Sequence, residues 1–257
     1  MFALIYFLCI DSFAFMQKNL KLILPMLLGS LIHSALKPLE IDFPSLFFLN
    51  WLVFELFIPC FINIYLIVYL FKFGGILLSE DSTISLIKKH YKNGLWIYLL
   101  GGLFSFLIVS PFFVYLRLAS TDPEYSNLIL LYFTGGLFSF LLMGSHSLAL
   151  CCLIYIKNEP YKAFVAGLKE LKDGFSYYLL LVLINYVVSY FPSFLFLAPS
   201  SFSANLQLAE YYFYQEENLL SVIFSVAVKT WFLISITYVF LYRKNNLKFQ
   251  PLYAGKS

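Results

Sequence analysis

The sequence has little charge. Only 12% of its 257 residues are Asp, Glu, Lys or Arg, whereas soluble globular domains contain roughly 25%. Hydrophobic residues make up 61% of the chain, and the mean hydropathy is +0.82. The 30 Phe and 20 Tyr residues suit both lipid contact and the membrane interface. This composition predicts a protein that is surrounded mainly by lipid.

The sequence also lacks the motifs of common enzymes and nucleotide-binding proteins. It contains no HExxH, no GxSxG, no P-loop and no paired carboxylates within an apolar run. Its four cysteines, Cys9, Cys60, Cys151 and Cys152, lie in apolar runs without a CxxC pair, so they are read as small hydrophobic side chains. We therefore expect no enzymatic activity, no cofactor and no metal. The basic residues are divided among short loops, so we expect no nucleic-acid partner.

Six apolar runs are long enough to cross a membrane, which takes about 20 helical residues. They predict one all-α membrane domain, a polytopic bundle of six spanning helices arranged as three hairpins. Residues 1–16 are too short to span, so we expect an interfacial helix there, with a re-entrant or seventh spanning segment left open. The six expected spans are 20–36, 45–71, 94–116, 128–156, 175–198 and 219–242.

The placement of basic residues predicts the orientation of these spans. Fourteen of the 17 Lys and Arg residues fall on one side of the expected membrane, and only Lys37 and Arg117 fall on the other. Because positive residues collect in cytoplasmic loops, both termini are expected in the cytoplasm, including a tail over 243–257. Anionic lipids at the cytoplasmic face are the expected lipid partners.

The two cytoplasmic connections are expected to be amphipathic surface helices. Over 158–174, Asn158 can cap a helix, Pro160 suits its first turn and Gly174 its end. The connection over 79–94 has acids at its start and bases at its end, as the helix dipole favours. Each helix either rests on the inner leaflet or offers a docking surface to a cytoplasmic partner. Together with the N-terminal helix they predict three units, each a surface helix followed by a transmembrane hairpin.

The heptapeptide GGLFSFL occurs twice, at 101–107 and at 135–141, within neighbouring expected spans that run in opposite directions. A glycine and a serine four residues apart let helix backbones approach closely. An antiparallel pairing of the two copies would place each phenylalanine near the other copy's glycine. We therefore predict a helix-packing seam formed by Gly101, Ser105, Gly135 and Ser139.

Two charged residues lie inside expected spans, Glu55 and Lys229. Each is ten residues past the outer end of its span, which corresponds to a depth of roughly 15 Å. A lone charge at that depth is costly, so two readings stay open: a buried pair that clasps the first and third hairpins, or a substrate or proton site. Asn63 can add hydrogen bonds nearby. His146, in MGSHSLALCC, is either a hydrogen-bonded interior histidine or a proton or metal site.

Three stretches carry a resemblance to a known kind of protein: KNLKLILPMLLGSLI, FLIVSPFFVYL and ALCCLIYIKNEPYKAFVAGLKELKDGF. They are similar to bacterial inner-membrane proteins of the YciC-like kind and to the membrane domain attached to some glycerophosphodiester phosphodiesterases. The resemblance implies a six-helix bacterial inner-membrane protein with no agreed activity and no catalytic residues to carry over. The sequence departs from that pattern in its Phe and Tyr content and in an acidic outer loop over 199–218.

The sequence therefore leaves two alternative functions. The first is a non-enzymatic envelope, scaffold or partner-binding role, with a membrane-protein partner or a second copy of the chain. The alternative is a small-molecule or lipid transporter, or an accessory permease subunit, with a polar centre at Glu55 and Lys229. A transporter requires water to reach that centre, whereas a scaffold requires it to be dry.

Overall fold

The computed structural model describes residues 2–42, 52–74, 76–77, 82–119, 144–155, 159–196 and 219–245. These residues are helical and include no strand, which confirms the all-α prediction. The helices are α1 (Phe2–Lys18), η1 (Leu20–Leu22), α2 (Leu24–Asp42), η2 (Leu52–Phe57), α4 (Ile58–Phe73), α5 (Thr83–Ala119), an unlabelled helix over Gly144–Tyr155, α7 (Pro160–Asp173), α8 (Phe175–Phe196) and α10 (Leu219–Asn245).

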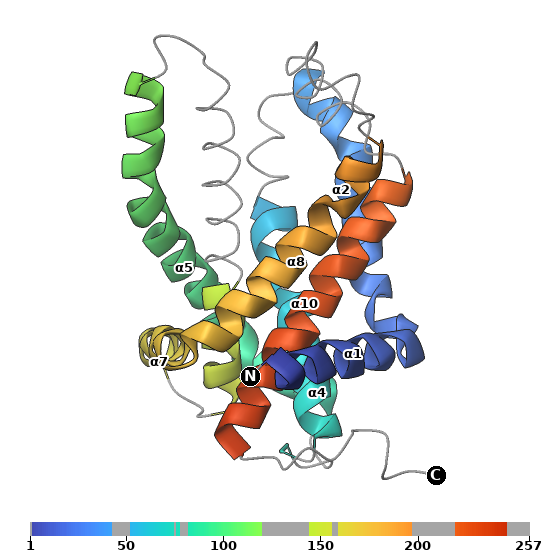
Figure 1. Cartoon of the computed structure of the whole chain (residues 1–257), viewed down its shortest axis with the longest axis vertical. Coiled ribbons are helices and arrows are strands. Elements are labelled where there is room, and N and C mark those ends of the chain that lie inside the picture. The colour runs from blue at the N-terminus through green and yellow to red at the C-terminus, as the bar shows by residue number, and fades with distance from the viewer. Residues whose placement is uncertain are drawn as a thin grey trace.

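The helices take two orientations (Figure 1). α2, α5 and α10 run steeply along the length of the molecule and α8 runs obliquely in front of them, whereas α1 lies across and α7 is seen end-on at one side. Two segments among the described residues are long and apolar enough to cross a membrane, Leu52–Phe73 and Val222–Lys244. Shorter apolar helices cover Leu20–His33, Gly144–Tyr155 and Phe175–Asn185. Residues 128–143 of the expected fourth span lie outside the described residues.

α5 differs from the expected arrangement. A surface helix over 79–94 was expected to end where a span begins at Gly94, but one helix continues from Thr83 to Ala119. Gly94 serves close packing instead of ending a helix. A Cβ there would lie 2.6 Å from Ile64 Cδ1 and 3.0 Å from Cys60 Sγ, so the missing side chain lets α4 approach α5.

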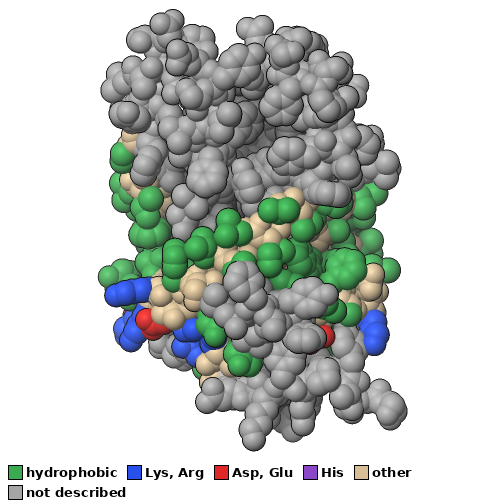
Figure 2. Space-filling model, viewed as in Figure 1, with side chains coloured by type: hydrophobic (Ala, Val, Ile, Leu, Met, Phe, Trp, Pro, Cys, Tyr) green, Lys and Arg blue, Asp and Glu red, His purple; other side chains and the backbone are tan. Residues whose placement is uncertain are grey.

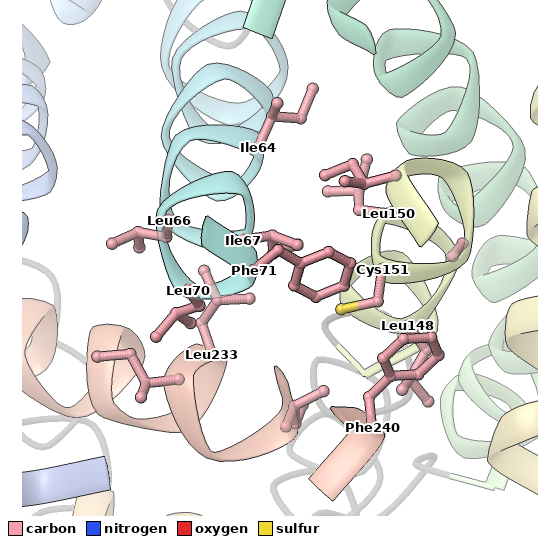
Figure 3. Packing of buried hydrophobic residues seen from close by; sticks show 14 of the residues in the cluster. Ile64, Leu66, Ile67, Leu70, Phe71, Leu148, Leu150, Cys151, Leu233 and Phe240 are labelled. Atoms are coloured by element: carbon pink, nitrogen blue, oxygen red, sulfur yellow. The ribbon is translucent and has the colours of Figure 1, made fainter. Parts of the chain in front are cut away.

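The core lies where α4, the helix over Gly144–Tyr155 and α10 meet (Figure 3). Ile64, Ile67 and Leu70 of α4 are buried there with Leu148 and Leu150 of the second helix and Leu233 of α10. Three aromatic rings close one side of this core: Phe71 stacks on Phe240, with centroids 6.2 Å apart, and Tyr155 meets both rings edge-on. Segments far apart in sequence thus share one apolar interior.

The helix that leads into α4 is widened over η2, a π-helical segment that includes Glu55. Pro59 accounts for this locally, since proline has no N–H and its ring clashes with the carbonyl four residues earlier in an α-helix. That carbonyl belongs to Glu55. π-helical turns of this kind relieve such conflicts by lengthening the hydrogen-bond step.

α1 crosses α10, so the first and the last of the described helices are in contact. Ser12 Oγ and Ser235 Oγ are 2.7 Å apart, and Trp231 Nε1 donates a hydrogen bond of 3.1 Å to the carbonyl of Cys9. The ring of Phe15, fully buried, meets Tyr238 edge-on. The first helix is therefore held along the second half of the last.

Candidate functional site

The described part of the chain places apolar side chains on the outside and several polar side chains on the inside. Figure 2 shows a band of hydrophobic side chains on one face, with Lys and Arg side chains along its lower edge. The buried polar residues are Ser12, Asn63, His90, Ser105, Ser145, His146, Ser147, Glu170, Thr230, Ser235 and Thr237. Two groups of them form the candidate sites described below.

The first group, the polar cluster, consists of Asn63, Tyr98 and His146, which contact one another, and of Ser105, which lies about two turns further along the same face of α5. Asn63 Nδ2 of α4 donates a hydrogen bond to the Tyr98 hydroxyl of α5. The imidazole of His146 stacks on the Tyr98 ring, with centroids 4.5 Å apart and an angle of 10°. His146 Nε2 lies 3.1 Å from the backbone carbonyl of Tyr98. Because a carbonyl only accepts, His146 carries its proton on Nε2 when neutral and donates it there.

Helical spacing brings these groups to one face of α5. Tyr98, Gly101 and Ser105 follow each other by three and four residues, which places them in a row along the helix. A Cβ at Gly101 would overlap the imidazole of His146, so the glycine provides the space that the ring occupies. Tyr98 thereby connects three helices: its hydroxyl meets α4, and its ring and carbonyl meet the helix over Gly144–Tyr155.

Two oxygen atoms of the polar cluster are buried without a hydrogen-bond partner, Asn63 Oδ1 and Ser105 Oγ. Asn63 is 7% exposed and Ser105 is 2% exposed. A buried polar atom left unsatisfied typically costs about 1–3 kcal/mol. Such atoms are rare in folded proteins, and they mark places that a water molecule or a small polar ligand can satisfy.

The structure brings some of the predicted site residues together and separates others. Asn63 and His146 meet through Tyr98, whereas Lys229 is exposed on α10 and does not belong to this buried cluster. Glu55 lies in η2, but its side chain is outside the described residues. The pairing of Glu55 with Lys229 therefore stays a prediction, and the structure places its lysine partner at the surface.

The predicted packing seam is half described. Gly101 and Ser105 are buried, as a seam requires, and Gly101 lies against His146. Gly135 and Ser139 lie outside the described residues, so their pairing with Gly101 and Ser105 stays a prediction. Phe106, expected to fill the opposite glycine patch, is 64% exposed.

The second group is an ion-pair cluster around Glu170 of α7, which sequence reasoning missed. Glu170 is 3% exposed. Its Oε1 accepts hydrogen bonds from Arg243 Nε at 2.6 Å and from the Tyr178 hydroxyl at 3.3 Å, and its Oε2 accepts one from Lys244 Nζ at 2.7 Å. This carboxylate ties α7 to the start of α8 and to the end of α10.

The charges around Glu170 govern its protonation. Burial alone would raise the pKa of its carboxyl, but the hydrogen bonds and positive charges of Lys244 and Arg243 outweigh burial. The pKa of Glu170 therefore lies below its ordinary value, and the residue is ionised at neutral pH.

A helical projection of α7 shows why Glu170 is buried. Seen along α7, it falls on the same side as Ala163, Phe164 and Gly167, all of which are buried. The apolar residues Tyr161 and Val165 of the same helix are 67% and 45% exposed, so apolar character alone does not mark the buried side of α7. The signal is an acidic residue on the helix face that carries the small residues Ala163 and Gly167, because a face of small residues is one that packs closely against the protein.

The part of the chain that the structure describes holds no group of three or more His, Cys, Asp or Glu side chains able to bind a metal. The four cysteines are buried and free. Comparisons with protein-family models, with curated proteins and with solved structures find no match to this chain.

Proposed function

We propose that this chain is an integral membrane protein of six spanning helices with a non-enzymatic scaffold or partner-binding role. One observation carries the proposal: large apolar side chains are exposed along the outside of several helices. Exposed apolar residues lie on α2, α5, α8 and α10, among them Leu28, Ile32, Leu99, Leu103, Phe106, Leu183, Val187, Ile223 and Phe224. Contiguous apolar surface of this kind is unfavourable in water and suits hydrocarbon.

The compartment and orientation belong to the same proposal. Exposed lysines at the start of α5, on α7 and at the end of α10 fit a cytoplasmic face under the positive-inside rule, with both termini on that side. The resemblance to six-helix bacterial inner-membrane proteins is compatible with this arrangement and supports a bacterial inner membrane.

Lys229 lies apart from the polar cluster. It is exposed on α10, two residues before Trp231, which donates a hydrogen bond to α1. A long lysine side chain on the outer face of a spanning helix can extend its ammonium group toward the headgroups.

The polar cluster supports a structural role within this bundle. Tyr98 contacts two other helices at once, and the imidazole of His146 fills the space beside Gly101. Hydrogen bonds between helices inside a membrane hold them in one arrangement. A tightly filled polar centre of this kind suits a protein that acts through its surface.

Thiol accessibility tests this function. The four native cysteines are replaced, and Ser105→Cys is introduced in the full chain. Cells and inverted membrane vesicles are then treated with a membrane-impermeant maleimide. A scaffold with a dry centre predicts no labelling from either side, while Ser85→Cys, exposed near the start of α5, is labelled from the cytoplasmic side. Labelling of Ser105→Cys would favour transport.

Transport remains the second candidate because of the two unsatisfied oxygen atoms. Asn63 Oδ1 and Ser105 Oγ are the buried groups that a passing polar solute or water could satisfy. In that case the polar centre comprises Asn63, Ser105 and His146, with Lys229 outside it. Labelling at residue 105 that is blocked by a particular solute would identify the class of substrate.

A further inference from the structure

The surface of α7 is divided into three sectors around the helix axis. With about 100° per residue, one sector holds the buried Ala163, Phe164, Gly167 and Glu170. The next holds Tyr161 and Val165, which are exposed and apolar. The third holds Lys162, Lys169 and Asp173, which are exposed and charged, whereas the exposed Lys172 projects between Tyr161 and Val165, about two to three turns further along the helix. A helix that lies in water beside a protein needs only two sectors, because its outer face is uniformly polar.

Contacts of the buried sector place α7 on the flank of the bundle. Phe164 meets Phe104 of α5 edge-on, with centroids 5.8 Å apart. A Cβ at Gly167 would lie 2.7 Å from the backbone nitrogen of Ala149, so α7 touches the backbone of the helix over Gly144–Tyr155. Next to Phe104, α5 exposes Leu103. On each side of the contact between Phe164 and Phe104 the adjacent residue, Val165 on α7 and Leu103 on α5, is apolar and exposed.

The exposed surface of α7 carries three lysines against the single carboxylate of Asp173, because Glu170 is buried on the opposite side. The Glu170 carboxylate is neutralised inside by Arg243 and Lys244. At the surface, Lys162 has Glu159 at 3.4 Å as a partner. Lys169 and Lys172 are exposed, and none of the ion pairs found among the described residues involves them. These two ammonium groups are available to an external anion.

α1 shows the same division independently. Its buried sector holds Cys9, Ser12, Phe15 and Met16. Its second sector exposes Ile10 and Phe13, with the polar Gln17 between them, and its charged sector holds Asp11 and Lys18. Seen down each helix axis, the three sectors follow in the same rotational order in α1 and α7. Two helices unrelated in sequence share a surface that fits protein on one side, hydrocarbon on the second and headgroups on the third.

We infer that α7 is a binding site for anionic phospholipid of the cytoplasmic leaflet. Tyr161 and Val165 contact the acyl chains next to Leu103, and Lys169 and Lys172 bind the phosphate and acidic headgroup. The inference rests on the proposed membrane location and adds a defined lipid partner to it. Charge complementarity selects an anionic lipid over a zwitterionic one, since each nearby lysine favours the anionic surface.

A lipid titration tests the partner. The full chain, purified in detergent, is titrated with dioleoyl phosphatidylglycerol or dioleoyl phosphatidylcholine, and bound lipid is counted by native mass spectrometry. We expect preferential binding of phosphatidylglycerol. Lys169→Gln with Lys172→Gln should weaken it by roughly fivefold for each lysine removed. Lys88→Gln with Lys89→Gln, exposed at the start of α5 and equal in charge change, is the matched control.

Two outcomes would overturn the inference. One is equal binding of the two lipids. The other is equal weakening by both double variants, because total charge would then explain the binding without α7. All four lysines are exposed, so an unchanged melting temperature without added lipid shows that the variants are folded.

A second measurement separates this inference from the membrane location on which it depends. An environment-sensitive fluorophore is attached at Val165→Cys or Leu103→Cys in the variant without native cysteines, reconstituted in vesicles that contain a spin-labelled quencher lipid. Quenching at both positions is expected. Quenching at residue 103 alone would leave the membrane location standing and overturn the lipid contact of α7. Quenching at neither position would overturn the proposed function itself.

Discussion

The glycine at residue 101 controls how closely two helices approach each other. A Cβ there would overlap the imidazole of His146, whereas a Cβ at the adjacent Gly102 would meet no atom within 4 Å. We predict that Gly101→Ala lowers the stability of the purified protein by roughly 1–3 kcal/mol, the usual cost of overpacking. Gly102→Ala on the same helix should have little effect. Thermal unfolding in detergent measures both, and equal effects would contradict the contact.

The carboxylate of Glu170 is predicted to fasten α7 to the end of α10. Glu170→Gln keeps the shape of the side chain but removes the charge that Arg243 and Lys244 share. Because the two cations are partly exposed to solvent, we expect a loss of roughly 1–3 kcal/mol, less than for a fully buried pair. Limited proteolysis within α7 should become faster in this variant. Unchanged cleavage would show that the ion pairs do not hold α7.

The lowered pKa of Glu170 gives this attachment a pH dependence. The contribution of the ion pairs is fully present above the ordinary pKa of 4.5 and is lost as pH falls through the lower pKa of the folded protein. We therefore expect the difference in melting temperature between the wild-type protein and Glu170→Gln to be constant near neutral pH and to shrink below pH 4.5. A difference that grows in acid would have the wrong sign.

Some of these residues can be found from sequence and others cannot. Asn63 and His146 stand out because a polar residue within an apolar run is uncommon and has few ways to be satisfied. Tyr98 is one of 20 tyrosines, and nothing local shows that its hydroxyl faces Asn63. The partners of Glu170 lie 73 residues away at Arg243, so their meeting depends on tertiary packing alone.

At the scale of elements, the contact of α7 with the bundle depends on a second glycine. A Cβ at Gly167 would lie 2.7 Å from the nitrogen and 2.8 Å from the Cα of Ala149. Since backbone atoms cannot rotate away, we predict that Gly167→Ala displaces α7 and speeds hydrogen exchange over 160–173. Gly144→Ala is the matched control, because its Cβ would meet no atom within 4 Å. Equal exchange in the two variants would refute the contact.

The boundaries of the helices show which local signals are decisive. α8 begins at Phe175, directly after Gly174, so a glycine separates it from α7 as the sequence suggested for the end of that helix. The expected break at Gly94 is wrong because a glycine can mark close packing as well as a helix end. The widened turn of η2 follows from Pro59, whose ring would clash with the carbonyl of Glu55 in a regular α-helix.

At the scale of the whole molecule, the exposed apolar side chains are predicted to be essential for membrane integration. Leu103→Asp places a charge on the outer surface of α5, where a membrane protein faces hydrocarbon. Insertion measurements give about 2.5–3.5 kcal/mol for Asp at the centre of a spanning helix. We expect a clear loss of protein in the membrane fraction after carbonate extraction.

Ser85→Asp is the control for this change, because it adds the same charge at an exposed position near the start of α5. It should leave membrane integration unchanged. If Leu103→Asp behaves in the same way, the apolar surface of α5 does not face hydrocarbon.

The contacts of α10 with α1 and α7 have a consequence for biosynthesis. Cys9 cannot contact Trp231, and Glu170 cannot contact Arg243, until α10 has been translated. At about 5–20 residues per second, the interval between Glu170 and Arg243 is roughly 4–15 s. During this time the nascent chain exposes an unpaired carboxylate and an unattached first helix. Insertion of α10 therefore completes both contacts, and a chain that stops before α10 would leave α1 and α7 without these partners.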